Sequence, residues 1–323
     1  MKMKKNILGV DIGGTKCAVI YGQKEGDTLH LVEKVKFPTM SVDETIANIC
    51  SEIEQMMGRH GLDSSNTGAI GISCGGPLDS KRGVVMSPPN LPGWNDIPIV
   101  RMLEERFGIR TGIHNDANAC ALAEWKFGAG VGTQNMVFLT FGTGLGAGLI
   151  LDGKLYAGTN DNAGELGHIR LSEFGPVGYG KCGSFEGFAS GGGIAQLARF
   201  KVSEKQQMGE SVAWCPPGQL DSISAHTVAL AAASGDPLAL EIYRISATYL
   251  GRGLAMVIDL LNPEVIVIGS IYVRNRELME PFVLQEIERE ALSHARRVCS
   301  VRPAKLGEQI GDYAALSVAA NLI

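Results

Sequence analysis

The stretch Leu8-Gly-Val-Asp-Ile-Gly-Gly-Thr-Lys-Cys-Ala-Val-Ile20 predicts a β-strand, a glycine turn and a second strand. Val and Ile favour strands, and Gly13 and Gly14 leave the backbone amides of the turn uncovered. Such a turn can donate N–H groups to phosphate oxygens. Asp11 places a carboxylate inside an apolar strand, and a hydrated Mg²⁺ beside the phosphates would account for it. A plain hairpin with a carboxylate at its edge explains this stretch equally well on its own.

The composition is that of an ordinary globular protein. With 323 residues, 45% of them hydrophobic, the chain is long enough for two domains. Acidic residues (34) outnumber basic ones (29), so the overall charge does not indicate binding to nucleic acid. The longest apolar stretch, residues 253–261, contains Asp259 and falls far short of the ~20 residues of a membrane span. Seven scattered cysteines without C-x-x-C spacing favour reduced thiols in a cytoplasm, and the basic start of the chain lacks the features of a secretion signal.

Hydrophobic periodicity and capping signals predict alternating strands and helices. The expected strands are residues 29–37, 67–73, 110–114, 137–141 and 145–151. The expected helices are residues 41–61, 99–107, 117–127, 237–260, 277–295 and 312–322. Asp236 and Pro237 are the preferred cap and first-turn residues of the long helix. This alternation predicts an α/β protein.

One motif suggests a hydrolase. The run Gly71-Ile-Ser-Cys-Gly75 matches the G-x-S-x-G nucleophile elbow, in which a helix begins directly after the serine. Gly75, Gly76 and Pro77 forbid a helix there, so we interpret the match as chance. A loop whose backbone lies against a small ligand fits these glycines better.

Asn115 and Asp116 follow the strand at residues 110–114 and precede strong helix formers. The carboxyl end of a strand in an α/β sheet is where ligands bind. Taken alone, the aspartate is better explained as an ordinary helix N-cap.

The opening pattern recurs from residue 136 onward, with Gly142-Thr-Gly144 as the turn between two strands. Two such units in one chain indicate a duplicated domain. Gly142, Gly144 and Ala147 also fit the loose dinucleotide pattern G-x-G-x-x-A, but strand-like residues follow where a Rossmann unit requires a helix. The dinucleotide interpretation is therefore set aside.

Taken together, four motifs resemble those of the ROK family, the sugar kinases and related repressors of the actin, Hsp70 and hexokinase superfamily. They are Asp11-Ile-Gly-Gly-Thr-Lys16, Asn115-Asp-Ala-Asn118, Gly142-Thr-Gly144 and Gly164-Glu-Leu-Gly-His168. The resemblance implies two actin-like (ribonuclease H-like) α/β domains with a cleft between them. It places the N-terminal domain at residues 1–115 and the C-terminal domain at residues 116–311, with the helix at 312–323 packing back on the first domain.

The resemblance also implies transfer of the γ-phosphoryl group of ATP to a sugar hydroxyl, with Asp116 as the catalytic base and Asp11 holding Mg²⁺ through water. The nucleotide and phosphate contacts would be Asp11, Gly13, Gly14, Thr15, Lys16, Gly142, Thr143, Gly144 and Gly269. The sugar contacts would be Gly75, Gly76, Asn90, Asn115, Asp116, Glu165, His168 and Glu186. Ser270 and Ile271 depart from the family, in which a glycine-rich turn is common at this point.

A second departure concerns zinc. ROK kinases usually hold a structural zinc with a histidine and the three cysteines of a C-x-C-G-x-x-G-C-x-E segment. Here Val177, Tyr179 and Ser184 occupy the three cysteine positions, and Cys182 falls at a position that is not a ligand. We therefore expect no structural zinc, and we expect packing of Val177, Tyr179, Phe185 and Phe188 to hold the loop.

The competing function is a sugar-sensing repressor or a binding protein of the same family without kinase activity. Such repressors carry a helix-turn-helix domain before the phosphate turn, and only six residues precede Ile7 here. We therefore expect a cytoplasmic kinase without nucleic-acid or membrane partners. The resemblance implies a homodimer and leaves the sugar open among hexoses and N-acetylhexosamines.

Overall fold

The computed structural model describes residues 4–323, so the first three residues of the basic start lie outside the described part. Contacts divide the chain into two compact units. The first unit comprises Met1–Gln134, Gly148–Ala163 and Lys305–Ile323, and the second comprises Asn135–Ala147 and Gly164–Ala304. This division differs from the boundary expected after residue 115. Residues 116–134 belong with the first unit because α3 (Asp116–Phe127) packs against α11 (Ile310–Ala320).

The first unit contains a five-stranded sheet in the order β3-β2-β1-β4-β7. Its strands are β1 (Lys4–Ile12), β2 (Lys16–Glu25), β3 (Thr28–Pro38), β4 (Thr67–Cys74) and β7 (Thr111–Asn115). The first three strands form an antiparallel meander, and β4 and β7 continue it in parallel. The remaining elements are α1 (Val42–His60), β5 (Leu78–Asp79), β6 (Val84–Val85), α2 (Ile99–Phe107), α3, η3 (Gly307–Gln309) and α11.

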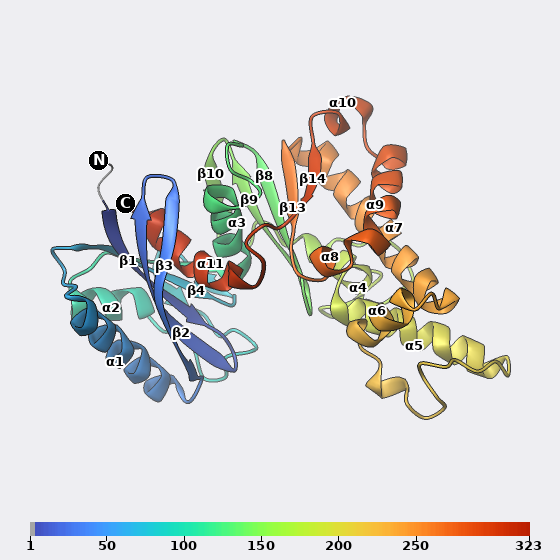
Figure 1. Cartoon of the computed structure of the whole chain (residues 1–323), viewed down its shortest axis with the longest axis horizontal. Helices are drawn as coiled ribbons and strands as arrows, with labels where there is room; N and C mark the ends of the chain where they lie inside the picture. Colours follow the sequence, from blue (N-terminus) through green and yellow to red (C-terminus); the bar gives the residue numbers. More distant parts are fainter. Residues whose placement is uncertain (1–3) are drawn as a thin grey trace. The chain divides into compact units, whose positions relative to one another are not determined.

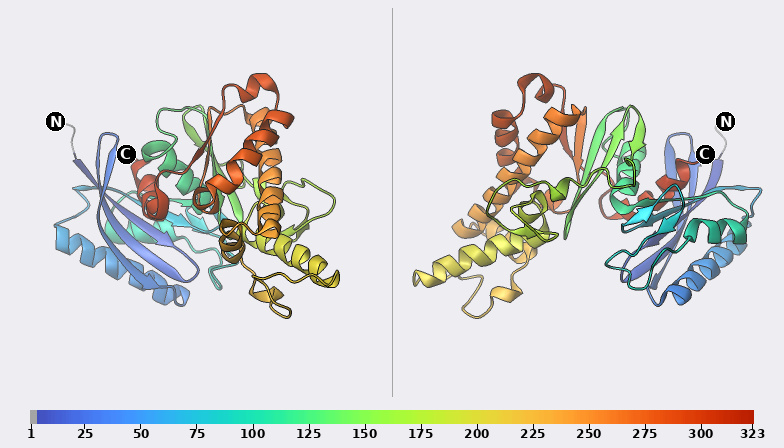
Figure 2. Two further views of the ribbon diagram at one scale, coloured as in Figure 1. Left: turned by 45° about the vertical axis from the view of Figure 1, so that its right-hand side comes forward. Right: turned by 180° about the vertical axis from the view of Figure 1, so that it is seen from behind.

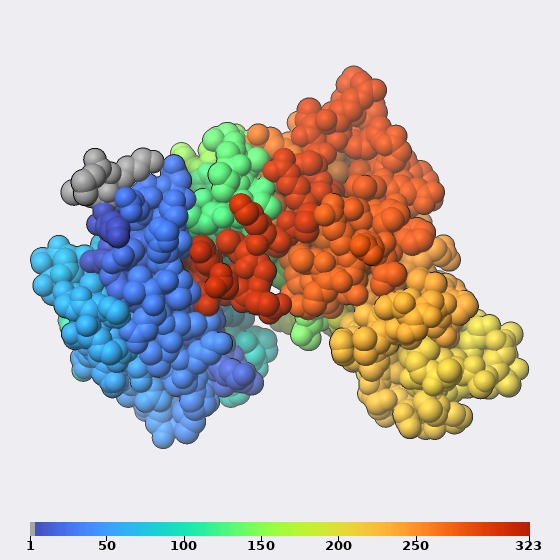
Figure 3. All heavy atoms as spheres, in the orientation of Figure 1, coloured from blue at the N-terminus to red at the C-terminus, as the bar shows by residue number. Residues whose placement is uncertain are grey.

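Alternation along β1 places successive side chains on opposite faces of this sheet. Leu8 and Val10 belong to the core formed with α1, whereas Ile7 belongs to the core formed with α11 (Figure 1). The C-terminal helix therefore completes the N-terminal unit, and the space-filling view shows its red atoms against the blue ones of the first strands (Figure 3).

Glycines in the sheet allow α11 to approach closely. A β-carbon at Gly9 would lie 3.0 Å from the β-carbon of Ala315, and one at Gly71 would collide with the backbone of the helix. Ser73 lies within β4 and is buried, and residues 75–77 continue as a loop. Close packing of α11 on β4 thus explains Gly71, the first residue of the apparent nucleophile elbow.

The second sheet has the order β10-β9-β8-β13-β14. Its strands are β8 (Met136–Phe141), β9 (Leu145–Leu151), β10 (Lys154–Tyr156), β13 (Val265–Ile268) and β14 (Ser300–Pro303), and the division between units falls within β9. Two further strands, β11 (Val177–Gly178) and β12 (Lys181–Cys182), form a separate hairpin. The helices are η1 (Leu166–His168), α4 (Phe185–Phe188), α5 (Gly191–Gln207), η2 (Leu220–Ser222), α6 (Ala225–Ala233), α7 (Pro237–Leu261), α8 (Ile271–Arg274), α9 (Arg276–Glu290) and α10 (Ser293–Arg296).

Each predicted helix has a counterpart in the structure, but the one expected at residues 277–295 is broken near residue 291, and α6 lies where no helix was predicted. Asp236 caps α7 by accepting a hydrogen bond from the backbone of Ala239 (2.9 Å), as expected. The helix expected over residues 277–295 is instead two helices, because the chain turns extended at Ala291 between α9 and α10. Figure 2 shows α7 beside α9 from two directions. Within residues 4–323, no helix is long and apolar enough to cross a membrane.

Candidate active site

The first phosphate turn joins β1 to β2 and is held in shape by hydrogen bonds. The N–H of Gly13 donates to the carbonyl of Lys16 (3.1 Å), and the Thr39 hydroxyl donates to the carbonyl of Gly13 (2.6 Å). Thr15 and Lys16 are exposed at its tip. The turn is therefore rigid where it would meet a ligand.

Asn90 connects this turn to the glycine loop after β4. A β-carbon at Gly14 would lie 2.5 Å from the Asn90 carbonyl oxygen, and one at Gly75 would lie 3.2 Å from its side-chain oxygen. The proline-rich loop thus brings three predicted site residues of the first unit together.

Asp11 lies at the carboxyl end of β1, beside the first turn of α11, where a β-carbon at Gly311 would be 3.6 Å from its Oδ2. Burial raises the pKa of Asp11 to about 6, and the negative charges of Asp312 and Asp116 act in the same direction. Lys34, which pairs with Asp312, opposes the shift. A partly buried carboxylate among other carboxylates fits the role of holding a hydrated cation.

Asn115 and Asp116 have different roles: one caps a helix, and the other presents an exposed carboxylate. Asn115 is the N-cap of α3, because its side-chain oxygen accepts a hydrogen bond from the backbone of Asn118 (2.8 Å). Asp116 begins the helix, is exposed, and accepts from the N–H of Ala117 (2.8 Å). Desolvation by the surrounding protein raises the pKa of Asp116, and the hydrogen bond from Ala117 opposes that shift. The carboxylate is thus available to a substrate, and the amide supplies the cap.

The second phosphate turn, Gly142-Thr-Gly144, lies against the start of α5. The N–H groups of Gly191 and Gly192 donate to the carbonyls of Gly142 (2.8 Å) and Thr143 (3.1 Å). The first helical N–H groups are therefore used to fix the turn. Thr143 remains exposed at the tip.

The Gly164-Glu-Leu-Gly-His168 motif packs directly on β9. A β-carbon at Gly164 or Gly167 would collide with the carbonyl oxygens of Ala147 and Leu145. Both glycines are thus needed for close approach, which leaves Glu165 and His168 exposed. A β-carbon at Gly167 would also lie 3.3 Å from the β-carbon of Glu186, so the three predicted sugar-binding side chains of the second unit gather at one place.

A pocket of about 500 Å³ lies in the second unit beside the second phosphate turn. It is lined by Gly142, Thr143, Gly191, Gly192, Ala195, Ile223, Ser224, Ala225, His226, Ser270, Ile271 and Arg274. Its volume suits a nucleoside. Sequence reasoning predicted only the first two of these residues. Gly191 and Gly192 belong to a glycine run, and Ser270 and Ile271 follow the Gly269 turn that the family resemblance indicates. The remaining lining residues come from segments without a motif.

Gly269 lies behind this pocket, with Phe138 3.5 Å from the position of its absent β-carbon, and the following Ser270 reaches the lining. Ser270 adopts a φ of 57°, which L-residues rarely do. This explains why a glycine suits the position and marks a strained point in the wall of the pocket.

The zinc segment does not provide the donors that zinc requires. Ser184 is fully buried and caps α4 by accepting from the N–H of Gly187 (3.1 Å). Val177 and Tyr179 are 46% and 81% exposed, so the expectation that they pack to hold the loop is wrong. Phe185 and Phe188 are buried as expected. Within residues 4–323, no group of three His, Cys, Asp or Glu side chains could hold a metal ion.

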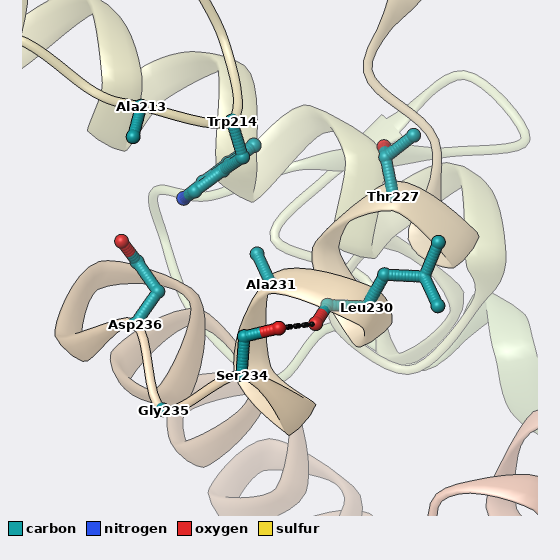
Figure 4. Close-up of a pocket in the computed structure, with 8 residues that line it drawn as sticks. All are labelled: Ala213, Trp214, Thr227, Leu230, Ala231, Ser234, Gly235 and Asp236. Carbon is teal, nitrogen blue, oxygen red and sulfur yellow. Dashed lines mark hydrogen bonds between the residues drawn. The ribbon is translucent and has the colours of Figure 1, made fainter.

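A larger pocket of about 620 Å³ lies between α6, the start of α7 and the loop at residue 214. Trp214 and Asp236 reach into it from opposite sides (Figure 4). None of the predicted site residues lines it. The smaller pocket is the better candidate for a nucleotide, because a phosphate turn borders it.

The predicted site residues form two groups, one in each unit. The first unit holds Asp11, Gly13, Gly14, Thr15, Lys16, Gly75, Gly76, Asn90, Asn115 and Asp116. The second holds Gly142, Thr143, Gly144, Glu165, His168, Glu186 and Gly269.

Two α/β units with paired glycine turns define a protein of the two-domain actin-like class, as predicted. Residues 7–321 match the ROK family, and the chain belongs to that family. A glucokinase of Streptomyces coelicolor is 33% identical over 315 residues, which are 97% of this chain and 96% of that protein. The crystal structure of a ROK family glucokinase from Streptomyces griseus, in complex with glucose and AMPPNP, is 31% identical, covers 98% of both chains and superposes with a TM-score of 0.72.

The family also contains regulators. The DNA-binding transcriptional repressor Mlc of Escherichia coli is 29% identical over 262 residues, which are 81% of this chain and 63% of the repressor. Similarity alone therefore supports a ROK sugar-kinase fold and leaves open which activity the chain carries.

Proposed function

We propose that this protein is an ATP-dependent sugar kinase that transfers the γ-phosphoryl group to a hydroxyl of a hexose or an N-acetylhexosamine. The observation that carries the proposal is the state of Asp116. Asn115 provides the helix cap, so the Asp116 carboxylate stays exposed, and desolvation raises its pKa above that of an ordinary aspartate. The relative solved with glucose and AMPPNP supports a hexose and ATP as the substrates.

The reaction assigns roles to both groups of residues. Asp116 would accept the proton of the sugar hydroxyl while the hydroxyl oxygen attacks the γ-phosphorus. The two glycine turns would donate N–H groups to the phosphates, and Asp11 would hold a hydrated Mg²⁺, which neutralises phosphate charge when bound. Glu165, His168 and Glu186 would accept and donate hydrogen bonds to sugar hydroxyls, together with Asn90, Asn115 and the backbone of residues 75 and 76.

The test is phosphorylation by ATP across a panel of hexoses and N-acetylhexosamines, with product detected by mass spectrometry. We expect turnover of at least one sugar. Sugar-dependent heat in calorimetry without any phosphorylated product would instead identify a regulator or binding protein, the alternative that the similarity to Mlc keeps open. We also propose that the protein is cytoplasmic, in keeping with its seven free cysteines. The proposal that it is a homodimer rests on the family resemblance alone.

A further inference from the structure

A glutamine holds the loop that corresponds, by the family resemblance, to the zinc segment. The side-chain oxygen of Gln196, on α5, accepts a hydrogen bond from the N–H of Val177 (2.9 Å). Its side-chain nitrogen donates to the carbonyl of the same residue (2.8 Å). Val177 occupies the first cysteine position of the zinc segment. The Val177 side chain is exposed, so this position is held through its backbone and not through its side chain.

The direction of both bonds fixes the orientation of the amide. Reversing oxygen and nitrogen would place donor against donor and acceptor against acceptor, so both bonds depend on a carboxamide. Each bond is an ordinary one in length, and together they tie the first strand of the β11–β12 hairpin to a long helix.

Other hydrogen bonds hold the loop to segments that lie close to it in the chain. Arg170 donates to the carbonyl of Cys182 (2.7 Å), and the N–H of Gly183 donates to the carbonyl of Pro176 (2.9 Å). The Lys181 ammonium donates to the carbonyl of His168 (2.8 Å). His168 is the last residue of η1, and the Ser184 hydroxyl at the start of α4 donates to the carbonyl of Gly178 (3.4 Å). The Gln196 pair adds two bonds to the long helix α5.

The hairpin in turn packs against Glu186. A β-carbon at Gly178, the residue after Val177, would lie 2.8 Å from the β-carbon of Glu186 and 2.7 Å from the Ser184 hydroxyl. Glu186 reaches the second phosphate turn, because its Oε2 accepts from the N–H of Leu145 (2.9 Å). A continuous path of contacts therefore runs from Gln196 through the hairpin to a predicted sugar-binding carboxylate.

We propose that Gln196 is a positioning residue that replaces structural zinc, holding the hairpin so that Glu186 is correctly placed for the sugar. The inference rests on the proposed function for its kinetic consequence. The anchoring of the hairpin is independent of any activity.

The anchoring is tested by hydrogen exchange on the protein without ligand. In Gln196→Ala, the Val177 amide should exchange at least tenfold faster than in the wild type. Gln206→Ala is the matched control, since Gln206 lies on the same helix and donates to a different loop, at the carbonyl of Cys215 (3.1 Å). Unchanged exchange at Val177, or equal acceleration there in the control, would overturn the proposal whether or not the protein is a kinase.

A conservative variant sharpens this result. In Gln196→Glu, the carboxylate can accept from the Val177 N–H but cannot donate to its carbonyl until it is protonated. Protection of Val177 should therefore be partial at neutral pH and recover toward the wild-type value as the pH falls below about 5. Protection that does not change with pH, relative to the wild type, would contradict a two-bond anchor.

The positioning role is tested by a double-mutant cycle with the sugar found in the phosphorylation panel. Gln196→Ala should raise the KM for that sugar about tenfold, and Gln206→Ala should not change it. In a Glu186→Ala background, Gln196→Ala should raise the KM no further, because it acts through Glu186. Effects that multiply would overturn the positioning role. If the wild type phosphorylates no sugar, the same cycle is measured with the dissociation constant of glucose by calorimetry.

Discussion

The backbone N–H of Leu145 donates a hydrogen bond to Oε2 of Glu186 at 2.9 Å, so a predicted sugar ligand also supports the second phosphate turn. Glu186→Ala would remove this acceptor, so the Leu145 N–H would lose its hydrogen bond to Oε2. We expect KM to rise about tenfold or more for both ATP and sugar, since a hydrogen bond to a charged group is worth ~1.5–3 kcal/mol. Glu165→Ala is the comparison and should raise only the KM for sugar. Initial-rate kinetics with each substrate varied decide the point, and an unchanged KM for ATP in Glu186→Ala would refute the double role.

Asp116→Asn keeps the size of the side chain and removes the base. We expect kcat to fall by roughly 10²–10⁴-fold with little change in thermal stability. Because the pKa of Asp116 is raised, wild-type kcat/KM should be lost on acidification through a pKa above that of an ordinary aspartate. A pH–rate profile measures both effects. Turnover of the variant close to the wild-type rate would rule out this residue as the base.

Asp11 should make the protein less stable as the pH rises. Its pKa is about 6 in the folded protein, against 3.8 for an unperturbed aspartate, so the folded state binds the proton more tightly. The contribution of Asp11 to the free energy of unfolding has its full value below about pH 4 and is lost as the pH rises through about 6. Asp11→Asn should abolish that loss and be more stable above pH 6 by at most about 3 kcal/mol. Urea unfolding at pH 4 and pH 7 tests this, and a difference between variant and wild type that is the same at both values would contradict it.

Gly14→Ala should damage the first phosphate turn. The added β-carbon would lie 2.5 Å from the Asn90 carbonyl oxygen, so the turn and the proline-rich loop must separate. We expect a loss of ~1–3 kcal/mol in the free energy of unfolding and a KM for ATP at least tenfold higher. The control is Gly58→Ala in α1, where nothing lies within 4 Å of the new β-carbon. It should stabilise the protein by ~0.5–1 kcal/mol.

Ser270→Gly should relieve strain beside the pocket that we propose for the nucleotide. Ser270 holds a φ of 57°, which glycine adopts without steric cost. We expect the free energy of unfolding to rise by about 1 kcal/mol. Ser270→Ala separates the backbone effect from loss of the hydroxyl, because alanine keeps the strain. Denaturant unfolding that shows equal stability for the two variants would assign the effect to the hydroxyl instead.

Much of the fold follows from local sequence signals. The alternating residues of β1 and β2, the helix start at Asp236 and Pro237, and the glycine turns at residues 13 and 142 all lie where the pattern predicts them. These features depend on neighbours in the chain, which is why periodicity and turn chemistry reveal them. The break between α9 and α10 was missed because the sequence there continues a helical pattern.

The sequence by itself determined where the two glycine turns lie, because a turn depends on residue type and short spacing. The tertiary structure alone decided why Gly71 and Gly167 must be glycine, since distant segments press against them. It also decided how the loop at residues 177–186 is held. A glutamine on α5 binds the backbone of Val177, 19 residues away, and a backbone hydrogen bond of this kind leaves no signature in the identity of the residue it holds.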